Sequence, residues 1–311
     1  MKIRTVGIIG TGVIGSSWAA FYASKGFEVK LYDLDPSLSR KGLQRAESFL
    51  AGLARYGLLE NDEHKKAASR MAIVDTLEQG VKEAQLVQES VAETYEVKHQ
   101  VFTIMDAETN PEAILASSSS GLLMTEIQKV TRHPERCIIA HPFNPPHLIP
   151  LVELVPGKGT SETTLSLMKD FFEDLGKTPV VLRKETPGHI ANRLAAALWR
   201  EATDIVLKGI ASVEDVDKAV CAGPGLRWAL MGPQMIYHLG GGEGGIAHFF
   251  DHLGPAFETY LEDMATWTAF PPESKQVLVD GVEEEMKGRK LAELTRWRDE
   301  KLAGILKVIY S

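Results

Sequence analysis

The chain is poor in cysteine. Its 311 residues include only two, Cys137 and Cys221, and neither lies in a CxxC pair. Two cysteines cannot build a disulfide framework, and this usage favours a reducing compartment. The sequence also starts without a leader pattern and lacks an apolar run long enough to span a bilayer. We therefore expect a cytoplasmic protein that does not enter the membrane.

An excess of basic charge is also missing. Asp and Glu number 42 against 34 Lys and Arg, which gives a net charge of −8. Nucleic acids and anionic membranes need a dense basic face, so we expect neither as a partner. Apolar residues make up 44% and charged residues 24%, which is ordinary for a soluble globular protein. The length suits two domains rather than one.

The first part of the chain alternates strand patterns with helix patterns. A helix is expected over 14–25, and a longer one begins at the cap pair Asp35 and Pro36. The expected strands are 3–9, 28–33, 84–91, 112–119, 136–143, 150–156 and 178–184. Such alternation predicts the α/β class, with a doubly wound, mostly parallel sheet of the Rossmann type covered on both faces.

The pattern changes near Thr186. Residues 186–209 form one long helical stretch, a further helix is capped by Ser212, and only helix and loop patterns follow. We predict two domains, a Rossmann domain over 1–187 and an all-helical domain over 188–311. The glycine-dense stretch 239–245 is either a loop or helix break or a mobile wall of the substrate site.

The stretch "GIIGTGVIGSSW" contains a GxGxxG motif in the required context, after a strand and opening a helix. Its glycines, Gly10, Gly12 and Gly15, allow a tight turn, a close approach of pyrophosphate and close packing of helix on strand. Val13 and Ile14 open the helix. Asp33 ends the second strand, where a carboxylate binds ribose hydroxyls and repels a 2′-phosphate. The motif predicts NAD, although a glycine-rich turn of another doubly wound protein is the alternative.

Four polar residues are expected at the carboxyl edge of the sheet: Ser120, His141, Glu153 and Asn192. Ser120 and His141 lie at the ends of expected strands, Glu153 lies on the next strand, and Asn192 lies early in the first helix of the second domain. Ligands bind along the carboxyl edge of the sheet in doubly wound folds. Oxidation of a secondary alcohol needs a base, which a neutral imidazole supplies near pH 7. A carboxylate on the far ring nitrogen fixes the tautomer, and a hydroxyl and an amide hold the substrate oxygen.

The sequence resembles the 3-hydroxyacyl-CoA dehydrogenase family over nearly its whole length. The motifs are "GTGVIGSSWA", "ESVAETYEVK", "ASSSSGLL", "HPFNPPHLIPLVELVP" and "ETPGHIANRL". The resemblance implies an N-terminal Rossmann domain and a C-terminal helical domain that dimerises. It also implies the following roles: His141 as general base, Glu153 as its partner, Ser120 and Asn192 as substrate-oxygen donors, Asn144 on the nicotinamide side, and Glu93, Lys98 and Ser120 as cofactor contacts.

Two departures from the acyl-CoA enzymes favour a free acid as substrate. The short Gly-Pro turn of that family is expanded to residues 223–233 and carries Arg227, whose guanidinium suits capture of a carboxylate. The chain also continues past the usual end. Both features resemble a small-acid branch that includes L-gulonate 3-dehydrogenase (lambda-crystallin) and carnitine 3-dehydrogenase. We expect an L-gulonate-like acid as substrate, with carnitine as the first alternative and a short-chain 3-hydroxyacyl-CoA as the second.

Other interpretations stay open at this point. Arg227 also suits a surface ion pair or an inter-subunit contact, and Trp228 suits core packing more than a cation site. A structural protein with this fold, like the lens crystallins of that branch, and a nucleotide-sensing module are the alternatives to an enzyme. The histidines do not have the spacing of a metal motif, so no metal is expected.

Overall fold

The computed structural model describes residues 2–60 and 62–310. The chain divides into two compact units. The first comprises Met1–Arg193 and Asp299–Lys307, and the second comprises Leu194–Arg298 and Val308–Ser311. The predicted division at 187 and 188 stays a prediction.

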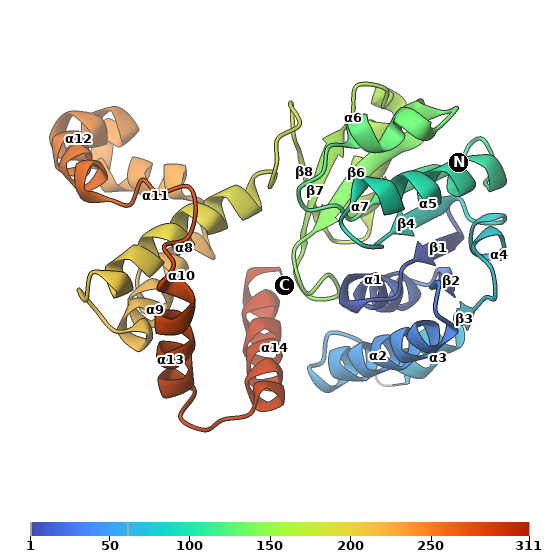
Figure 1. Cartoon of the computed structure of the whole chain (residues 1–311), viewed down its shortest axis with the longest axis horizontal. Helices are drawn as coiled ribbons and strands as arrows, with labels where there is room; N and C mark the ends of the chain where they lie inside the picture. The colour runs from blue at the N-terminus through green and yellow to red at the C-terminus, as the bar shows by residue number, and fades with distance from the viewer. Residues whose placement is uncertain (1, 61, 311) are drawn as a thin grey trace. The chain divides into compact units, whose positions relative to one another are not determined.

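The first unit is built on an eight-stranded sheet with the order β3-β2-β1-β4-β5-β6-β7-β8. The strands are β1 Thr5–Ile9, β2 Glu28–Tyr32, β3 Met71–Ile73, β4 Leu86–Glu89, β5 Ile114–Ser117, β6 Cys137–Pro142, β7 Leu151–Pro156 and β8 Thr178–Val181. Strands β1 to β6 are parallel. Strand β7 runs antiparallel to β6, and β8 is parallel to β7. Figure 1 labels these strands along the chain, apart from β5.

This order confirms the predicted doubly wound, mostly parallel sheet. Strands β4, β5 and β6 are buried along their whole length, as parallel strands covered on both faces must be. Their sequences are apolar apart from polar residues near the carboxyl ends: Gln88, Glu89, Ser117 and His141. Strand β3 was not predicted, because its three residues are too few to show a period.

Helices cover both faces of the sheet. Those of the first unit are α1 Val13–Ser24, α2 Pro36–Arg55, α3 Glu63–Ser69, α4 Leu77–Val81, α5 Tyr95–Glu108, α6 Met124–Ile127 and α7 Glu162–Asp174, with short 3₁₀ turns at Gln128–Val130 and Pro134–Arg136. Asp35 caps α2 by accepting from the Ser37 N–H at 2.7 Å, as the sequence predicts. Helix α1 ends before Gly26, which has a φ of +92° and stops the helix as expected.

Two apolar layers hold the sheet. On one face, Trp18 and Tyr22 of α1 stack at 5.2 Å, and Phe172 of α7 lies 5.7 Å from Trp18. On the other face, Phe102 and Met105 of α5 are fully buried. Close packing on both faces makes the sheet rigid, so the groups at its carboxyl edge have fixed positions.

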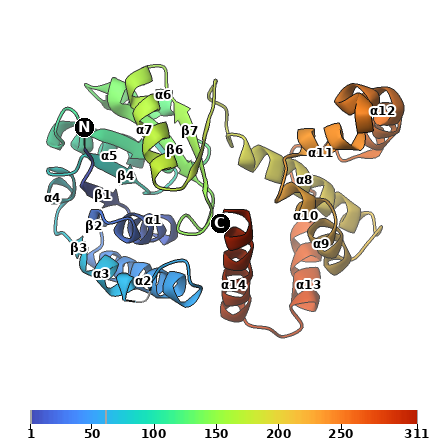
Figure 2. The same cartoon turned by 180° about the vertical axis from the view of Figure 1, so that it is seen from behind.

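The second unit is helical. Its elements are α9 Val213–Ala222, α10 Pro224–Trp228, α11 Pro233–Gly240, the 3₁₀ turn Gly242–Gly244, α12 Gly245–Asp263 and α13 Ser274–Met286, while α8 Ala191–Leu207 and α14 Leu291–Ile309 carry residues of both units. Ser212 caps α9 by accepting from the Asp215 N–H at 3.1 Å. Helix α9 lies beside α13 (Figure 2), where Gly281 leaves room for Val213. In the described part of the chain no helix is long and apolar enough to cross a membrane.

Candidate functional site

The glycine motif forms the turn between β1 and α1. Gly10 has a φ of +90°, and a Cβ there would lie 2.6 Å from the Ser90 oxygen. A Cβ on Gly15 would lie 1.9 Å from the Gly10 oxygen, so the first turn of α1 needs glycine to pack on the strand. A Cβ on Gly12 would meet no atom within 4 Å, and α1 begins there without a side-chain cap. The first N–H groups of α1, at Val13 and Ile14, are therefore left for an anion.

A pocket of about 720 Å³ lies against this turn. Its lining includes Gly10, Gly12 and Asp33, together with residues of α2, α4 and α5. The Asp33 Oδ2 accepts from the Thr11 N–H at 2.7 Å and from the Thr11 hydroxyl at 3.0 Å. Among the described residues nothing donates to Oδ1, which leaves that oxygen for ribose hydroxyls. The residues present therefore fit a dinucleotide of the NAD type.

His141 and Glu153 are opposite residues of the antiparallel pair β6 and β7. The His141 Nδ1 lies 2.9 Å from the Glu153 Oε2. Both side chains are buried, with exposed fractions of 6% and 1%. Because a carboxylate only accepts, Nδ1 carries the proton and Nε2 of the neutral ring has a free lone pair. The strand register thus builds the predicted pair directly.

Glu153 is held by more than the imidazole. Its Oε1 accepts from the backbone N–H of Ile190 at 2.8 Å and of Ala191 at 2.9 Å, where α8 begins. Burial by itself raises the pKa of Glu153. The hydrogen bonds from His141, Ala191 and Ile190 outweigh burial, so that its pKa lies below the ordinary value. Glu153 is therefore a carboxylate at neutral pH.

The serine loop after β5 is held by Glu93. The Glu93 Oε1 accepts from the Ser119 hydroxyl at 2.7 Å, the Ser120 N–H at 2.7 Å and the Gly121 N–H at 3.0 Å. Burial raises the pKa of Glu93, but these bonds and the nearby Lys98 ammonium outweigh it and leave its pKa below the ordinary value. Among the described residues the Ser120 hydroxyl has no partner, so it is free to meet a ligand.

Lys98 is buried, with an exposed side-chain fraction of 1%. Its ammonium donates to both oxygens of Glu89, at 2.8 and 3.0 Å, and lies 3.3 Å from the Glu93 Oε2. Glu89 also accepts from the Ser117 hydroxyl at 2.6 Å. Three acceptor oxygens match the three protons of the ammonium. The predicted cofactor contact of Lys98 stays a prediction, and Lys98 holds Glu93 in place.

The two asparagines lie on different elements. Asn144 is exposed, in the proline-rich loop between β6 and β7 and before a cis proline. Asn192 is half-buried in the first turn of α8, directly after the Ala191 N–H that binds Glu153. The shared helix start therefore couples Asn192 to the His141–Glu153 pair.

Arg227 and Trp228 end α10 in the second unit. The Arg227 side chain is exposed and makes no hydrogen bond or ion pair in the described part of the chain. Trp228 is half-buried, and its buried indole N–H has no partner among the described residues. The predicted role of Arg227 in substrate binding stays a prediction.

Sequence reasoning missed three members of this site. Glu89 is a buried carboxylate at the end of the buried strand β4, and Ser119 binds Glu93 through its hydroxyl. His189, with an exposed fraction of 1%, lies beside His141, with the ring centres 5.1 Å apart. A charged residue inside a buried strand was a usable signal for Glu89. Nothing in the local sequence placed His189 next to His141.

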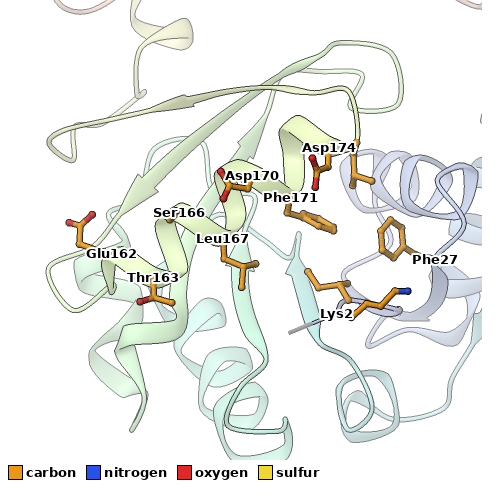
Figure 3. Close-up of a pocket in the computed structure, with 11 residues that line it drawn as sticks. Lys2, Phe27, Glu162, Thr163, Ser166, Leu167, Asp170, Phe171 and Asp174 are labelled. Carbon is orange, nitrogen blue, oxygen red and sulfur yellow. The ribbon is translucent and has the colours of Figure 1, made fainter.

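A second, shallow pocket of about 790 Å³ lies along α7. Figure 3 shows the Phe171 ring of α7 next to the Phe27 ring, which it meets edge to face at 5.6 Å, with Asp170 and Asp174 on the same helix. Neither the histidine pair nor the glycine turn lines it. We therefore place the functional site at the carboxyl edge of the sheet and not in this pocket.

Family models match both parts of the chain. Residues 5–186 match the NAD binding domain of 3-hydroxyacyl-CoA dehydrogenase, and residues 188–281 match the C-terminal domain of the same family. Together they cover most of the chain.

Curated relatives are similar along nearly the whole chain. An L-carnitine dehydrogenase from Streptomyces coelicolor is 40% identical over 98% of this chain and 95% of its own length. An L-carnitine dehydrogenase from Oceanobacillus iheyensis is 38% identical over 99% of this chain and 98% of its own length. These relatives favour the carnitine alternative over the L-gulonate expectation.

Solved structures share the fold. The structure of 5-formyl-3-hydroxy-2-methylpyridine 4-carboxylic acid 5-dehydrogenase matches with a TM-score of 0.84 and 27% identity, over 100% of this chain and 99% of that chain. A (S)-3-hydroxybutyryl-CoA dehydrogenase from Ralstonia eutropha matches with a TM-score of 0.66 and 28% identity, over 83% and 89%. The chain belongs to the 3-hydroxyacyl-CoA dehydrogenase family and is an NAD-dependent oxidoreductase that acts on a CH–OH group.

Proposed function

We propose that this enzyme oxidises the C3 hydroxyl of a small free 3-hydroxy acid, with L-carnitine as the first candidate. The observation that carries the chemistry is the buried pair of His141 Nδ1 and Glu153 Oε2 at 2.9 Å. Similarity to the L-carnitine dehydrogenases supports the substrate. The L-gulonate expectation rests on the resemblance to the small-acid branch, and the relatives reported above support L-carnitine better.

The base in this proposal is the His141 Nε2. It accepts the hydroxyl proton as hydride leaves C3, and Glu153 stabilises the imidazolium that forms. Bound NAD supplies the hydride acceptor. Ser120 and Asn192 hold the substrate oxygen by hydrogen bonds, while Asn144 and the Glu93-held serine loop face the nicotinamide side of the site.

Arg227 supplies the carboxylate clamp in this proposal. Arg227 has a guanidinium without a partner among the described residues, and a planar guanidinium binds a carboxylate through two parallel hydrogen bonds. A free acid presents that carboxylate, whereas a thioester does not. The clamp therefore distinguishes the small acids from acyl-CoA substrates.

We also propose a homodimer formed through the helical unit. Large apolar side chains of that unit are exposed, including Leu198, Trp199, Leu226, Leu230, Met235, Phe250 and Leu261. Exposed apolar surface on this scale marks a protein interface in a soluble protein. Light scattering during gel filtration tests this: a particle of twice the chain mass of 34.2 kDa supports the dimer, and a monomer at micromolar concentration contradicts it.

Substrate profiling tests the proposed reaction. Initial rates of NADH formation are measured with L-carnitine, L-gulonate, L-3-hydroxybutyrate and 3-hydroxybutyryl-CoA, and repeated with NADP. We expect the largest kcat/KM with L-carnitine and NAD. Turnover of the thioester alone contradicts the free-acid proposal, and a preference for L-gulonate overturns the choice of L-carnitine.

A further inference from the structure

His189 lies at the entrance to α8 in an unusual backbone conformation. Its φ is +49°, which is uncommon for a residue with a side chain, although histidine is among the more tolerant types. The backbone N–H of His189 donates to the Thr186 oxygen at 3.1 Å, which closes the turn. The side chain is almost fully buried. A buried ring on a strained turn needs a specific partner to hold it.

That partner is the serine loop. The His189 Nε2 lies 2.9 Å from the backbone oxygen of Ser119. Because a carbonyl oxygen only accepts, Nε2 carries the proton and the neutral ring has its lone pair on Nδ1. The Nδ1 atom is buried and has no partner in the described part of the chain. Burial lowers the pKa of His189, and the nearby His141 lowers it further, so the ring stays neutral.

The contact fixes one peptide plane at both ends. The Ser119 oxygen and the Ser120 N–H belong to the same planar peptide group. His189 donates to that oxygen at 2.9 Å, and the N–H donates to the Glu93 carboxylate at 2.7 Å. With both polar atoms held, the plane cannot rotate, and the direction in which the Ser120 side chain leaves the backbone is set.

The same turn holds the catalytic carboxylate. Ile190 and Ala191, the two residues after His189, donate their N–H groups to the Glu153 Oε1. Asn192 comes next in α8. Four consecutive residues thus contact or carry three parts of the site: the serine loop, the Glu153 carboxylate and Asn192.

We propose that His189 is a positioning residue that sets Ser120 relative to Asn192 and the His141–Glu153 pair, through its hydrogen bond to the Ser119 oxygen. This inference rests on the proposed roles of Ser120 and Asn192 in holding the substrate oxygen. The 5.1 Å separation of the His189 and His141 rings does not make His189 a second base. Among the residues that the structure describes, no carboxylate pairs with His189, and its unpaired Nδ1 atom is buried.

Two substitutions separate the hydrogen bond from the shape of the residue. His189→Phe keeps a planar ring and loses the donor. His189→Gln keeps an N–H donor and loses the ring and the ability to titrate. Both carry the same backbone cost at a positive φ, so Gln is the matched control for Phe. Each is measured with L-carnitine for kcat and KM, with NAD titration for the cofactor Kd, and with melting temperature.

We expect His189→Phe to lose about tenfold in kcat/KM for L-carnitine, the effect of one lost hydrogen bond at a fixed site. His189→Gln should stay within about threefold of wild type, because its amide replaces the donor. The Kd for NAD should be unchanged in both. Equal kcat/KM for the Phe variant and wild type overturns the proposal, as does equal loss in both variants. Loss of all turnover in the Gln variant makes His189 the base and also overturns it.

A measurement that does not depend on turnover tests the positioning role of His189 independently of the proposed reaction. In ¹⁵N-labelled protein, the Ser120 amide resonance should move in His189→Phe and stay near its wild-type position in His189→Gln. A Ser120 resonance that is unmoved in the Phe variant overturns the positioning role. If wild type turns over none of the four substrates while the resonance behaves as expected, the proposed reaction fails and the positioning of Ser120 stands.

Discussion

The carboxyl edge of the sheet has two halves that are built differently. The cofactor half consists of the Gly10–Gly15 turn and Asp33, which belong to one strand–helix–strand unit. The catalytic half joins residues farther apart in the chain: 37 positions separate Glu153 from Ile190, and 70 separate His189 from Ser119. The cofactor half relies on backbone shape, whereas the catalytic half relies on buried side-chain hydrogen bonds. Damage to one half should therefore leave the other working.

The largest effect should come from the base. We expect His141→Gln to lower kcat by about a thousandfold, within the range that general base catalysis contributes. NAD titration should give an unchanged Kd, since His141 is absent from the lining of the cofactor pocket. A Kd that weakens in parallel with kcat contradicts the separation of the two halves.

A smaller effect should come from the second unit. Arg227→Met should raise KM for L-carnitine by about tenfold or more through the loss of a charge-assisted pair, with little change in kcat. The Kd for NAD should not change. Arg227→Lys is the control, because it keeps the positive charge and loses the planar pair of donors. Its KM for L-carnitine should lie between those of wild type and Arg227→Met. An unchanged KM in the Met variant removes Arg227 from the substrate site.

Asp33→Ala should affect the cofactor half alone. We expect about tenfold weaker binding of NAD, because the Oδ1 that is free for the ribose is lost, and a smaller preference for NAD over NADP. The value of kcat at saturating NAD should stay close to wild type. Asp33→Asn keeps the shape and one acceptor, and serves as the control. An unchanged cofactor preference in Asp33→Ala rules out the proposed role of this carboxylate.

The smallest effect concerns stability and pH. The pKa of Glu153 in the folded protein lies below its ordinary value of 4.5, so its carboxylate stabilises the fold above that pH. The contribution is lost as pH falls through the lowered folded pKa. Glu153→Gln should therefore have a lower free energy of unfolding than wild type at pH 7, and the difference should shrink as the pH falls below 4.5. Urea unfolding at several pH values measures it. A difference that is constant with pH contradicts the assignment.

The NAD cofactor could be predicted from the sequence because the signals of the cofactor half are local. The spacing of the glycines, the preceding apolar strand and the position of Asp33 are all visible within one short segment. The sequence also pointed to His141 and Glu153, since each interrupts an apolar strand, and the structure pairs their side chains, while their catalytic roles stay a prediction. The class of the fold followed from the alternation of strand and helix patterns, whereas the order of the strands came only from the structure.

The remaining contacts were beyond sequence reasoning because they depend on tertiary structure. The bond between His189 and the Ser119 oxygen joins two loops, and no period or motif connects them. In the sequence Lys98 looks like an ordinary polar helix position, yet in the structure its side chain is buried and paired with Glu89 and Glu93. These pairings depend on how the core packs, because each buried charge needs a partner.

The most direct test of the account follows the hydrogen on C3. L-carnitine with deuterium at C3 is incubated with the enzyme and NAD, and the product nicotinamide is examined by mass spectrometry and NMR. We predict that the deuterium appears on the reduced nicotinamide ring in step with formation of the 3-keto acid. Unlabelled NADH, or no NADH at saturating L-carnitine, contradicts the proposal that this site oxidises the C3 hydroxyl of a free acid by direct hydride transfer.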